Sequence, residues 1–276
     1  MRETINPRNH WNGADLFCDL YQVSRQEEGF YLLRDILKGF SHFPFENLSK
    51  IIKLQRSGPH IRLPVEVMED HKEMGLGGTC FSLTFLLQTI LDRCGFSTYP
   101  VMADMRAGRN THCCLVVKVG GRKYLLDPGY LLHLPVELDP AKTQVIDAGF
   151  SSVELKFNPQ TQYYNLFTFN QEGRKWRYGF RDLPTSPGDF LLYWRSSFGW
   201  KGMWGIYLTR STEDGLYYLH NDFMRRTTHQ GKRNYRLKGE DLVVGEIFGI
   251  KREIFEEAKE TLRRRRELSY GRARFG

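Results

Sequence analysis

A glycine pair two residues before a cysteine, in Gly77-Gly78-Thr79-Cys80-Phe81, constrains the fold more than any other stretch of the chain. The residues after it are apolar at positions 83, 86, 87, 90 and 91, the spacing of a helix with one face in a core, and Gly95 is placed to end that helix. Cys80 is therefore predicted at a helix N-terminus. Unpaired backbone N–H groups and the positive end of the helix dipole favour a thiolate there, so Cys80 is a candidate nucleophile.

A nucleophilic thiolate needs a base beside it and a group that orients the base. Residues 110–127 read as two strands joined by a two-residue Gly120-Gly121 turn. With that turn, Asp127 is the diagonal neighbour of His112 on one face of the sheet, where Cα atoms lie about 7–8 Å apart and an imidazole can bond to a carboxylate. The sequence therefore predicts Cys80, His112 and Asp127 as nucleophile, base and orienter.

These motifs resemble the arylamine N-acetyltransferase family. The cysteine motif is followed by a strand histidine and then by Leu126-Asp127-Pro128-Gly129-Tyr130, which is the family's order. Two further segments are similar to its opening and closing signatures: Phe43-Pro44-Phe45-Glu46-Asn47-Leu48, and Gly239-Glu240-Asp241-Leu242 through Ile247-Phe248-Gly249-Ile250. The resemblance covers nearly the whole chain. It implies a papain-like core, acetyl-coenzyme A as acyl donor, and ping-pong transfer to an arylamine, hydrazine or arylhydroxylamine through an acetyl-cysteine.

Several positions depart from the family pattern. An arginine usually stands where this chain has Leu76, an acidic residue where it has Ser82, and Val-Gly-Phe where it has Pro128-Gly129-Tyr130. The family's His-Pro-containing stretch has no clean counterpart, the nearest being residues 195–200. These departures leave the triad intact. The same triad also suits an amide synthase or a transglutaminase-like cysteine hydrolase, and the scaffold also suits a binding protein with altered catalysis.

The hydrophobic periodicity predicts an α+β fold, because it is helical up to Gly95 and alternating afterwards. Helices are expected at 15–21, at 30–40 with Gly39 as a stop, at 189–194, and at the end of 237–266, which also reads as holding a strand. Strands are expected at 61–63, 98–105, 113–119, 123–126, 153–157, 163–170, 176–180, 204–209 and 216–219.

The resemblance adds the architecture to this class: a papain-like or transglutaminase-like cysteine core with an N-terminal helical bundle, an antiparallel β-barrel and a C-terminal α/β lid. We expect three domains. Residues 1–95 are helical and carry the nucleophile, residues 96–188 form the antiparallel β domain with the histidine and aspartate, and residues 189–276 form the lid with a basic terminal helix.

Composition narrows the function classes. A chain of 276 residues with 41% hydrophobic content can bury a large core, and its opening lacks the pattern of a signal peptide. No run approaches the roughly 18 apolar residues of a membrane span. The five cysteines are odd in number and have no Cys-x-x-Cys spacing. We therefore expect a cytoplasmic protein in a reducing compartment, with no disulfide framework, no metal and no membrane partner.

The formal net charge of +8 is unevenly distributed. Residues 251–276 hold nine Lys or Arg and five Glu, a difference of +4 and half of the excess. Glutamates interleave with Arg263-Arg264-Arg265-Arg266 as helix-surface pairs do, which favours a solvated terminal helix over a nucleic-acid site. The expected partner is a small aromatic amine or hydrazine. Coenzyme A contacts and the oligomeric state are left open.

Two aromatic residues are candidates for acceptor binding, Tyr130 beside the aspartate and Phe198 in the tryptophan-rich segment. Cys113 and Cys114 flank His112 on the same strand and are interpreted as packing residues. Adjacent strand residues point to opposite faces, so His112 and Cys113 are poorly placed to share a metal ion.

Overall fold

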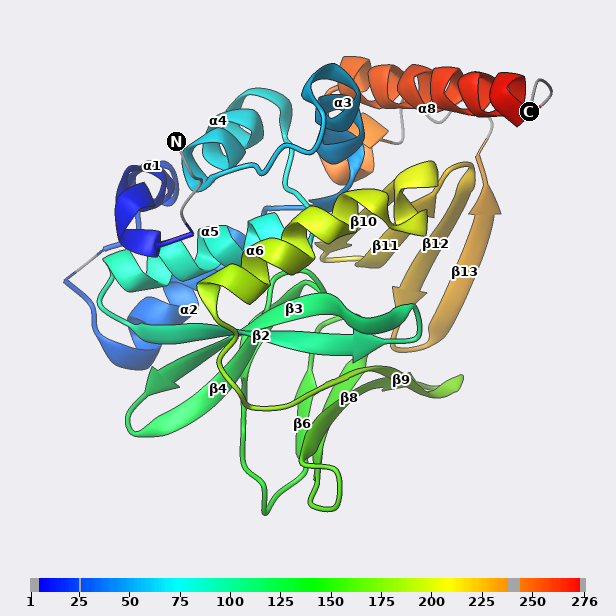
Figure 1. Ribbon diagram of the computed structural model, residues 1–276. Coiled ribbons are helices and arrows are strands. Elements are labelled where there is room, and N and C mark those ends of the chain that lie inside the picture. The colour runs from blue at the N-terminus through cyan, green and yellow to red at the C-terminus, as the bar shows by residue number, and fades with distance from the viewer. Residues whose placement is uncertain (1–4, 25, 238–243, 274–276) are drawn as a thin grey trace.

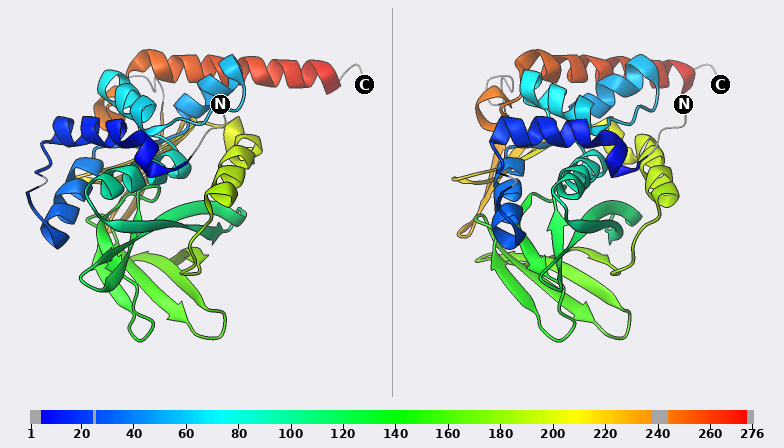
Figure 2. Two further views of the ribbon diagram at one scale, coloured as in Figure 1. Left: turned by 60° about the vertical axis from the view of Figure 1, so that its left-hand side comes forward. Right: turned by 90° about the vertical axis from the view of Figure 1, so that its left-hand side faces the viewer.

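Helices dominate the chain up to the first long strand, as the sequence predicts. The computed structural model describes residues 5–24, 26–237 and 244–273, and its early helices lie together on one side of the large sheet (Figures 1 and 2). They are η1 (Pro7–His10), α1 (Trp11–Tyr21), α2 (Gly29–Phe40), α3 (Leu48–Ser57), α4 (Pro64–Met74) and α5 (Cys80–Arg93). The helical N-terminal part of the predicted fold is thereby confirmed.

An antiparallel sheet of eight strands follows and curls into a nearly closed barrel, with strand order β5-β4-β3-β2-β9-β8-β7-β6 (Figure 1). Its strands are β2 (Ser97–Met105), β3 (Gly108–Val119), β4 (Arg122–Asp127), β5 (Leu132–Glu137), β6 (Gln144–Asp147), β7 (Ser152–Asn158), β8 (Tyr163–Asn170) and β9 (Gly173–Phe180). Buried residues such as Val116, Leu125 and Leu166 form its core. The α+β class with an antiparallel barrel is confirmed, although β5 and β6 were not predicted.

The turn between β3 and β4 has the geometry that the glycine pair predicts. Val119 pairs with Arg122, and Gly120 and Gly121 have φ angles of +57° and +77°. Two left-handed residues in a two-residue loop make the type I′ turn, whose twist matches that of the flanking strands. Because this turn fixes the register, the strand ends that carry the predicted base and orienter lie side by side.

Helix α5 is central to the molecule, packing against α1 and α4 and against strands β2 and β3. It begins at Cys80, and its apolar face is buried as the periodicity predicts. Gly95 follows its end with φ +83° and donates its N–H to the carbonyl of Asp92. Both predicted ends of this helix are therefore confirmed.

Two local predictions differ from the structure. Helix α2 continues through Phe40 rather than stopping at Gly39. The glycine instead serves close packing, since a Cβ at Gly39 would lie 3.0 Å from Phe17 of α1. Residues 61–63 are irregular rather than a strand and lead into α4, which was not predicted. Pro64 stands in the first turn of α4, where a helix needs no N–H from it.

A second antiparallel sheet has five strands in the order β1-β10-β11-β12-β13. Its strands are β1 (Phe45–Glu46), β10 (Tyr207–Thr212), β11 (Gly215–His220), β12 (Phe223–Thr228) and β13 (Gly231–Arg236). The remaining helical elements are α6 (Pro187–Ser196), η2 (Ser197–Gly199), η3 (Lys201–Trp204), the π-helical turn η4 (Val244–Phe248) and α8 (Arg252–Ala273). The β10–β11 hairpin and the terminal helix were predicted, whereas β12 and β13 were not.

Strand β1 joins the helical part to this second sheet, because it pairs with β10, and Phe45 also forms a bridge with Gly78 next to the nucleophile. Helix α8, at the end of the chain, packs on α3, which is one of the N-terminal helices. This contact also connects the N-terminal and C-terminal parts of the molecule. On α8, Arg263 pairs with Glu260 and Glu267, the helix-surface arrangement that the sequence predicts.

The division of the chain into three domains, with boundaries at residues 95 and 188, remains a proposal. Residues 239–242 of the closing signature lie outside the described residues.

Among the described residues, none of the helices combines the length and the apolar character required to cross a lipid bilayer.

Candidate active site

Cys80 is the first residue of α5, and its side chain is 7% exposed. The glycine pair before it is required by close packing of the loop. A Cβ on Gly77 would lie 1.9 Å from the carbonyl oxygen of Pro44, and one on Gly78 would lie 2.2 Å from Oγ of Ser82. Both clashes would displace the loop, so the glycines fix the position of the helix start that carries the sulfur.

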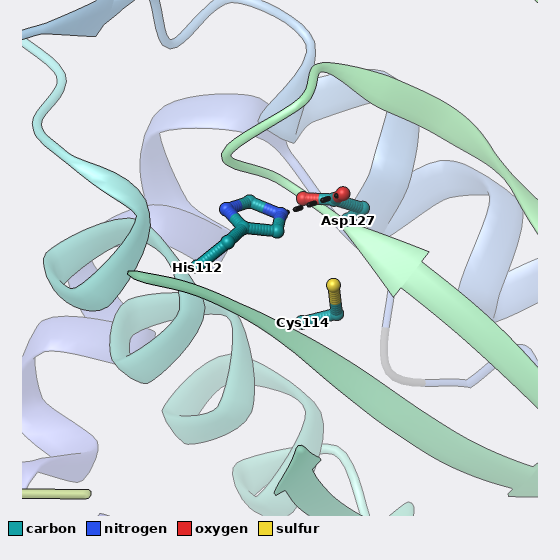
Figure 3. A group of neighbouring side chains, drawn as sticks. All are labelled: His112, Cys114 and Asp127. Carbon is teal, nitrogen blue, oxygen red and sulfur yellow. Dashed lines mark hydrogen bonds and ion pairs between the residues drawn. The ribbon is translucent and has the colours of Figure 1, made fainter. Parts of the chain in front are cut away.

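His112 and Asp127 lie on neighbouring strands and are joined by a hydrogen bond of 2.9 Å between Nε2 and Oδ2 (Figure 3). The imidazole is 4% exposed and the carboxylate is fully buried. The other carboxylate oxygen, Oδ1, accepts the backbone N–H of Tyr130 at 2.9 Å. With Nε2 donating to Asp127, the imidazole has Nδ1 available for the sulfur.

Gly129 marks where Cys80 and His112 meet. A Cβ on Gly129 would lie 2.7 Å from Cβ of Cys80 and 3.0 Å from Cε1 of His112. The turn after Asp127 therefore passes directly over both residues. The folded chain thus brings the three predicted residues together.

The electrostatics of the site favour a thiolate. A hydrogen bond from Cys113, together with the hydrogen bond and charge of His112 and the charge of Lys50, holds the pKa of Cys80 well below its ordinary value, although burial opposes this. Burial alone would lower the pKa of His112, but the charge of Asp127 and the neighbouring Cys114 raise it well above its ordinary value. Both shifts favour a thiolate at Cys80 beside an imidazolium at His112.

Cys113 and Cys114, interpreted from the sequence as packing residues, are both fully buried, and each also contacts the site. Cys113 points from β3 towards α5, where its sulfur lies 3.6 Å from Oγ1 of Thr84. Cys114 lies on the opposite face of β3, beside His112 and Asp127 (Figure 3). The packing interpretation is therefore incomplete, because it considered neither cysteine as a neighbour of the triad.

Among the described residues, His112, Cys114 and Asp127 are the group that could hold a metal ion, with ligand atoms within 4.8 Å of one another. Nitrogen, sulfur and oxygen donors suit zinc. However, Nε2 of His112 and Oδ2 of Asp127 already bond to each other, and burial followed by the charge of Asp127 raises the pKa of Cys114 to about 12. Both features disfavour ligation.

A buried arginine that sequence reasoning missed holds the nucleophile loop. The guanidinium of Arg62 donates to the carbonyl oxygen of Gly77 at 2.8 Å and to Asp70 at 2.9 Å, and it pairs with Glu46 at 3.3 Å. Leu76, where the resembling family has its arginine, is buried among apolar residues instead. The sequence carries no local signal for this role, because Glu46 and Gly77, which Arg62 contacts, come from other segments.

A cavity of about 370 Å³ opens beside Gly129 and runs between the barrel and the second sheet. Tyr130 lies in its wall, as do Phe45 and Tyr218. Four cationic side chains also line it: Lys175, Arg177, Arg225 and Lys232. Repulsion from Arg177 and then burial lower the pKa of Lys175, so positive charge accumulates in this cavity.

Phe198 does not lie in the wall of this cavity. Its side chain is 6% exposed, packs in the same apolar cluster as Cys80, and has the ammonium of Lys50 at 4.4 Å from its ring centroid. Of the two aromatic residues expected at an acceptor site, Tyr130 borders the cavity and Phe198 lies in the buried cluster that includes Cys80.

Comparisons with known proteins agree on one family. A family model described as N-acetyltransferase matches residues 31–256. The chain is similar to the arylamine N-acetyltransferase of Mycobacterium abscessus, with a TM-score of 0.77, 20% identity and coverage of 92% of this chain and 97% of that one. The Salmonella typhimurium arylamine N-acetyltransferase gives a TM-score of 0.72 at 16% identity, covering 89% and 97%.

A third similar structure is a Bacillus cereus arylamine N-acetyltransferase described as having a Cys-His-Glu catalytic triad. Its TM-score is 0.66 at 17% identity, with coverage of 87% of this chain and 99% of that one. At these identities the structural likeness establishes a shared fold. No curated protein matches the sequence.

Proposed function

The chain belongs to the arylamine N-acetyltransferase family, and we propose that it transfers an acetyl group from acetyl-coenzyme A to an arylamine, hydrazine or arylhydroxylamine through an acetyl-cysteine on Cys80. The observation that supports this most strongly is the contact of Gly129 with both Cys80 and His112, next to the 2.9 Å bond between His112 and Asp127. A low-pKa thiol, a charged base and a buried carboxylate are the groups that acyl transfer through sulfur requires.

The first half-reaction transfers the acetyl group to the enzyme. The Cys80 thiolate attacks the thioester carbonyl, and backbone N–H groups at the start of α5, including that of Cys80, stabilise the oxyanion. When the intermediate collapses, the carbon–sulfur bond to coenzyme A breaks. The leaving thiolate takes a proton from His112, which becomes neutral while Asp127 keeps its ring orientation.

The second half-reaction transfers the acetyl group to the acceptor. The acceptor amine attacks the acetyl-cysteine carbonyl while neutral His112 accepts the proton that the nitrogen loses. Expulsion of the Cys80 sulfur restores the thiolate beside the imidazolium. Nothing in this sequence of steps needs a metal ion, and the free thiol that it needs is consistent with a reducing, cytoplasmic location.

We place the phosphates of acetyl-coenzyme A in the cationic cavity, because it begins at Gly129 and its four Lys and Arg side chains suit an anionic donor. Tyr130 and Phe198 remain the proposed acceptor residues, Tyr130 at the mouth and Phe198 as the wall behind the sulfur. The proposed partners are small molecules, with neither nucleic acid nor membrane among them.

Neutralising the cavity is expected to weaken donor binding. Lys175→Gln and Arg225→Gln should each raise the Michaelis constant for acetyl-coenzyme A about three- to tenfold at low salt, with a smaller change at high salt, because exposed charges are screened. Arg122→Gln is the matched control, since Arg122 is exposed and pairs with Glu137 away from the cavity. Steady-state kinetics at two ionic strengths measure this, and unchanged constants in both cavity variants would exclude this donor site.

Adding one methyl group at Gly129 should separate the nucleophile from the base. In Gly129→Ala the new Cβ needs space 2.7 Å from Cβ of Cys80, so either the turn or the helix start must move. We expect a loss of transfer of about 10²-fold, the cost of roughly 1 Å of misplacement. Gly202→Ala is the control, because nothing lies within 4 Å of its Cβ. Equal rates for the two variants would contradict the close approach.

Initial-rate kinetics test the proposed reaction. Rates measured at several fixed concentrations of arylamine against acetyl-coenzyme A should give parallel double-reciprocal lines, because free coenzyme A leaves before the acceptor reacts. Intersecting lines would indicate direct transfer between two bound substrates and would contradict an acetyl-enzyme. Hydrolysis of acetyl-coenzyme A without any acetylated amine would indicate a hydrolase instead.

A further inference from the structure

Lys50, on α3, is a buried cation outside the proposed triad. Its side chain is 7% exposed, it donates to Oγ of Ser197, and its Nζ lies 4.4 Å from the centroid of the Phe198 ring. Among the described residues, no carboxylate oxygen lies within ion-pair distance of this ammonium, in contrast to Lys53 one turn later on the same helix, which pairs with Glu66 and Asp70. Lys50 therefore lacks the usual partner of a buried lysine.

The ring that the Lys50 ammonium contacts, Phe198, packs in the apolar cluster that also holds Cys80 and Cys113. Burial lowers the pKa of Lys50 to about 8, and the charges of Cys80 on α5 and Cys113 on β3 oppose that shift. Burial and then a hydrogen bond to Cys80 raise the pKa of Cys113 well above its ordinary value, which favours a neutral Cys113 and a negative charge on Cys80. The hydroxyl and the ring that contact Lys50 come from η2, whose Phe198 shares an apolar cluster with Cys80.

We propose that Lys50 is a positioning residue, a second cation besides His112 that stabilises the thiolate of Cys80 from the α3 side. This rests on the proposed function only in taking Cys80 as the nucleophile. A buried ammonium without a carboxylate is costly, and an adjacent thiolate offsets that cost. The same charge assists the second half-reaction, because the leaving group there is the Cys80 thiolate. Lys50 therefore acts on the turnover number more than on the Michaelis constant for the amine.

The test measures how fast iodoacetamide alkylates Cys80 in the full chain at a series of pH values. The mass of the Cys80 peptide reports the extent of alkylation, and the dependence of the rate on pH gives the apparent pKa of the thiol. In Lys50→Met, which keeps the length and apolar stem of the side chain, the apparent pKa of Cys80 should rise by about one unit, the usual effect of one nearby opposite charge. Lys50→Arg should restore most of the shift. Lys53→Met is the control: it breaks a carboxylate pair on the same helix and should lower the melting temperature without moving the titration.

A second measurement needs no variant. The rate ratio of iodoacetate to iodoacetamide at Cys80 reports cationic charge beside the sulfur, and in the wild-type protein it should fall several-fold around pH 8 as Lys50 loses its proton. A flat ratio, or an unchanged titration in a folded Lys50→Met protein, would overturn the proposal. Neither measurement involves acetyl-coenzyme A, so failure of the proposed transfer reaction would be seen separately.

Discussion

Replacing Cys80 with alanine should reduce acetyl transfer by at least about 10⁴-fold, the scale of losing a nucleophile that acts as a unit with its base. The side chain is small and 7% exposed, so the fold should survive the change with a loss of about 1 kcal/mol. Cys80→Ser should be nearly as inactive, because a hydroxyl does not ionise beside an imidazolium as a thiol does. Release of coenzyme A in the presence of an arylamine measures the rate.

The matched control for that experiment is Cys94→Ala. Cys94 follows the last residue of α5, about 20 Å along the helix from Cys80 at 1.5 Å per residue. It too is a cysteine outside any disulfide, so any general sensitivity to loss of a thiol would appear there as well. Full activity in Cys94→Ala with none in Cys80→Ala is the expected pair of results. Comparable activity in the two variants would remove Cys80 from the mechanism.

Asp127→Asn should lower kcat/KM by about 10³- to 10⁴-fold at neutral pH, the range seen where an orienting carboxylate is made neutral. The substitution keeps the shape of a fully buried side chain and removes the charge that raises the pKa of His112. The imidazole then loses its proton at lower pH, and the thiolate loses its partner. The acidic limb of the pH–rate profile should therefore move to higher pH.

The direction in which the acidic limb moves follows from the pKa values of Cys80 and His112 in the wild-type protein. Cys80 has a pKa well below its ordinary value and His112 one well above, so we expect the ion pair and the activity to persist through neutral pH. Asp182→Asn is the control, because Asp182 also bonds two side chains of the barrel, Tyr99 and Lys123, but does not contact the triad. An Asp127→Asn profile that overlays the wild type would contradict the orienting role.

The hairpin explains why sequence reasoning could predict the contact between base and orienter. Gly120 and Gly121 leave one compatible turn, the turn fixes the register, and the register makes Asp127 the diagonal neighbour of His112. Helix α5 could be predicted equally well, because apolar residues at helical spacing follow Cys80 without interruption and the pattern ends at Gly95. Each of these inferences depends on neighbours within one hairpin or one helix.

Contacts between distant segments could not be read in this way. Arg62 follows a turn-rich stretch, and its bonds to Glu46 and Gly77 exist only after three separate segments have folded together. Lys50 looks like a surface residue of an amphipathic helix until η2 covers it. In the same way, the cationic cavity needs strands from both sheets, and two of those strands, β12 and β13, are too polar to show an alternating apolar pattern.

The most direct test of an acetyl-cysteine is the mass of the Cys80 peptide after the wild-type protein has met acetyl-coenzyme A with no acceptor present. We expect that peptide to gain the mass of one acetyl group and to lose it when an arylamine is added, in step with the appearance of acetylated amine. If the amine is acetylated while the Cys80 peptide stays unmodified, or if the acetyl group is found on another residue, the reaction does not proceed through this sulfur.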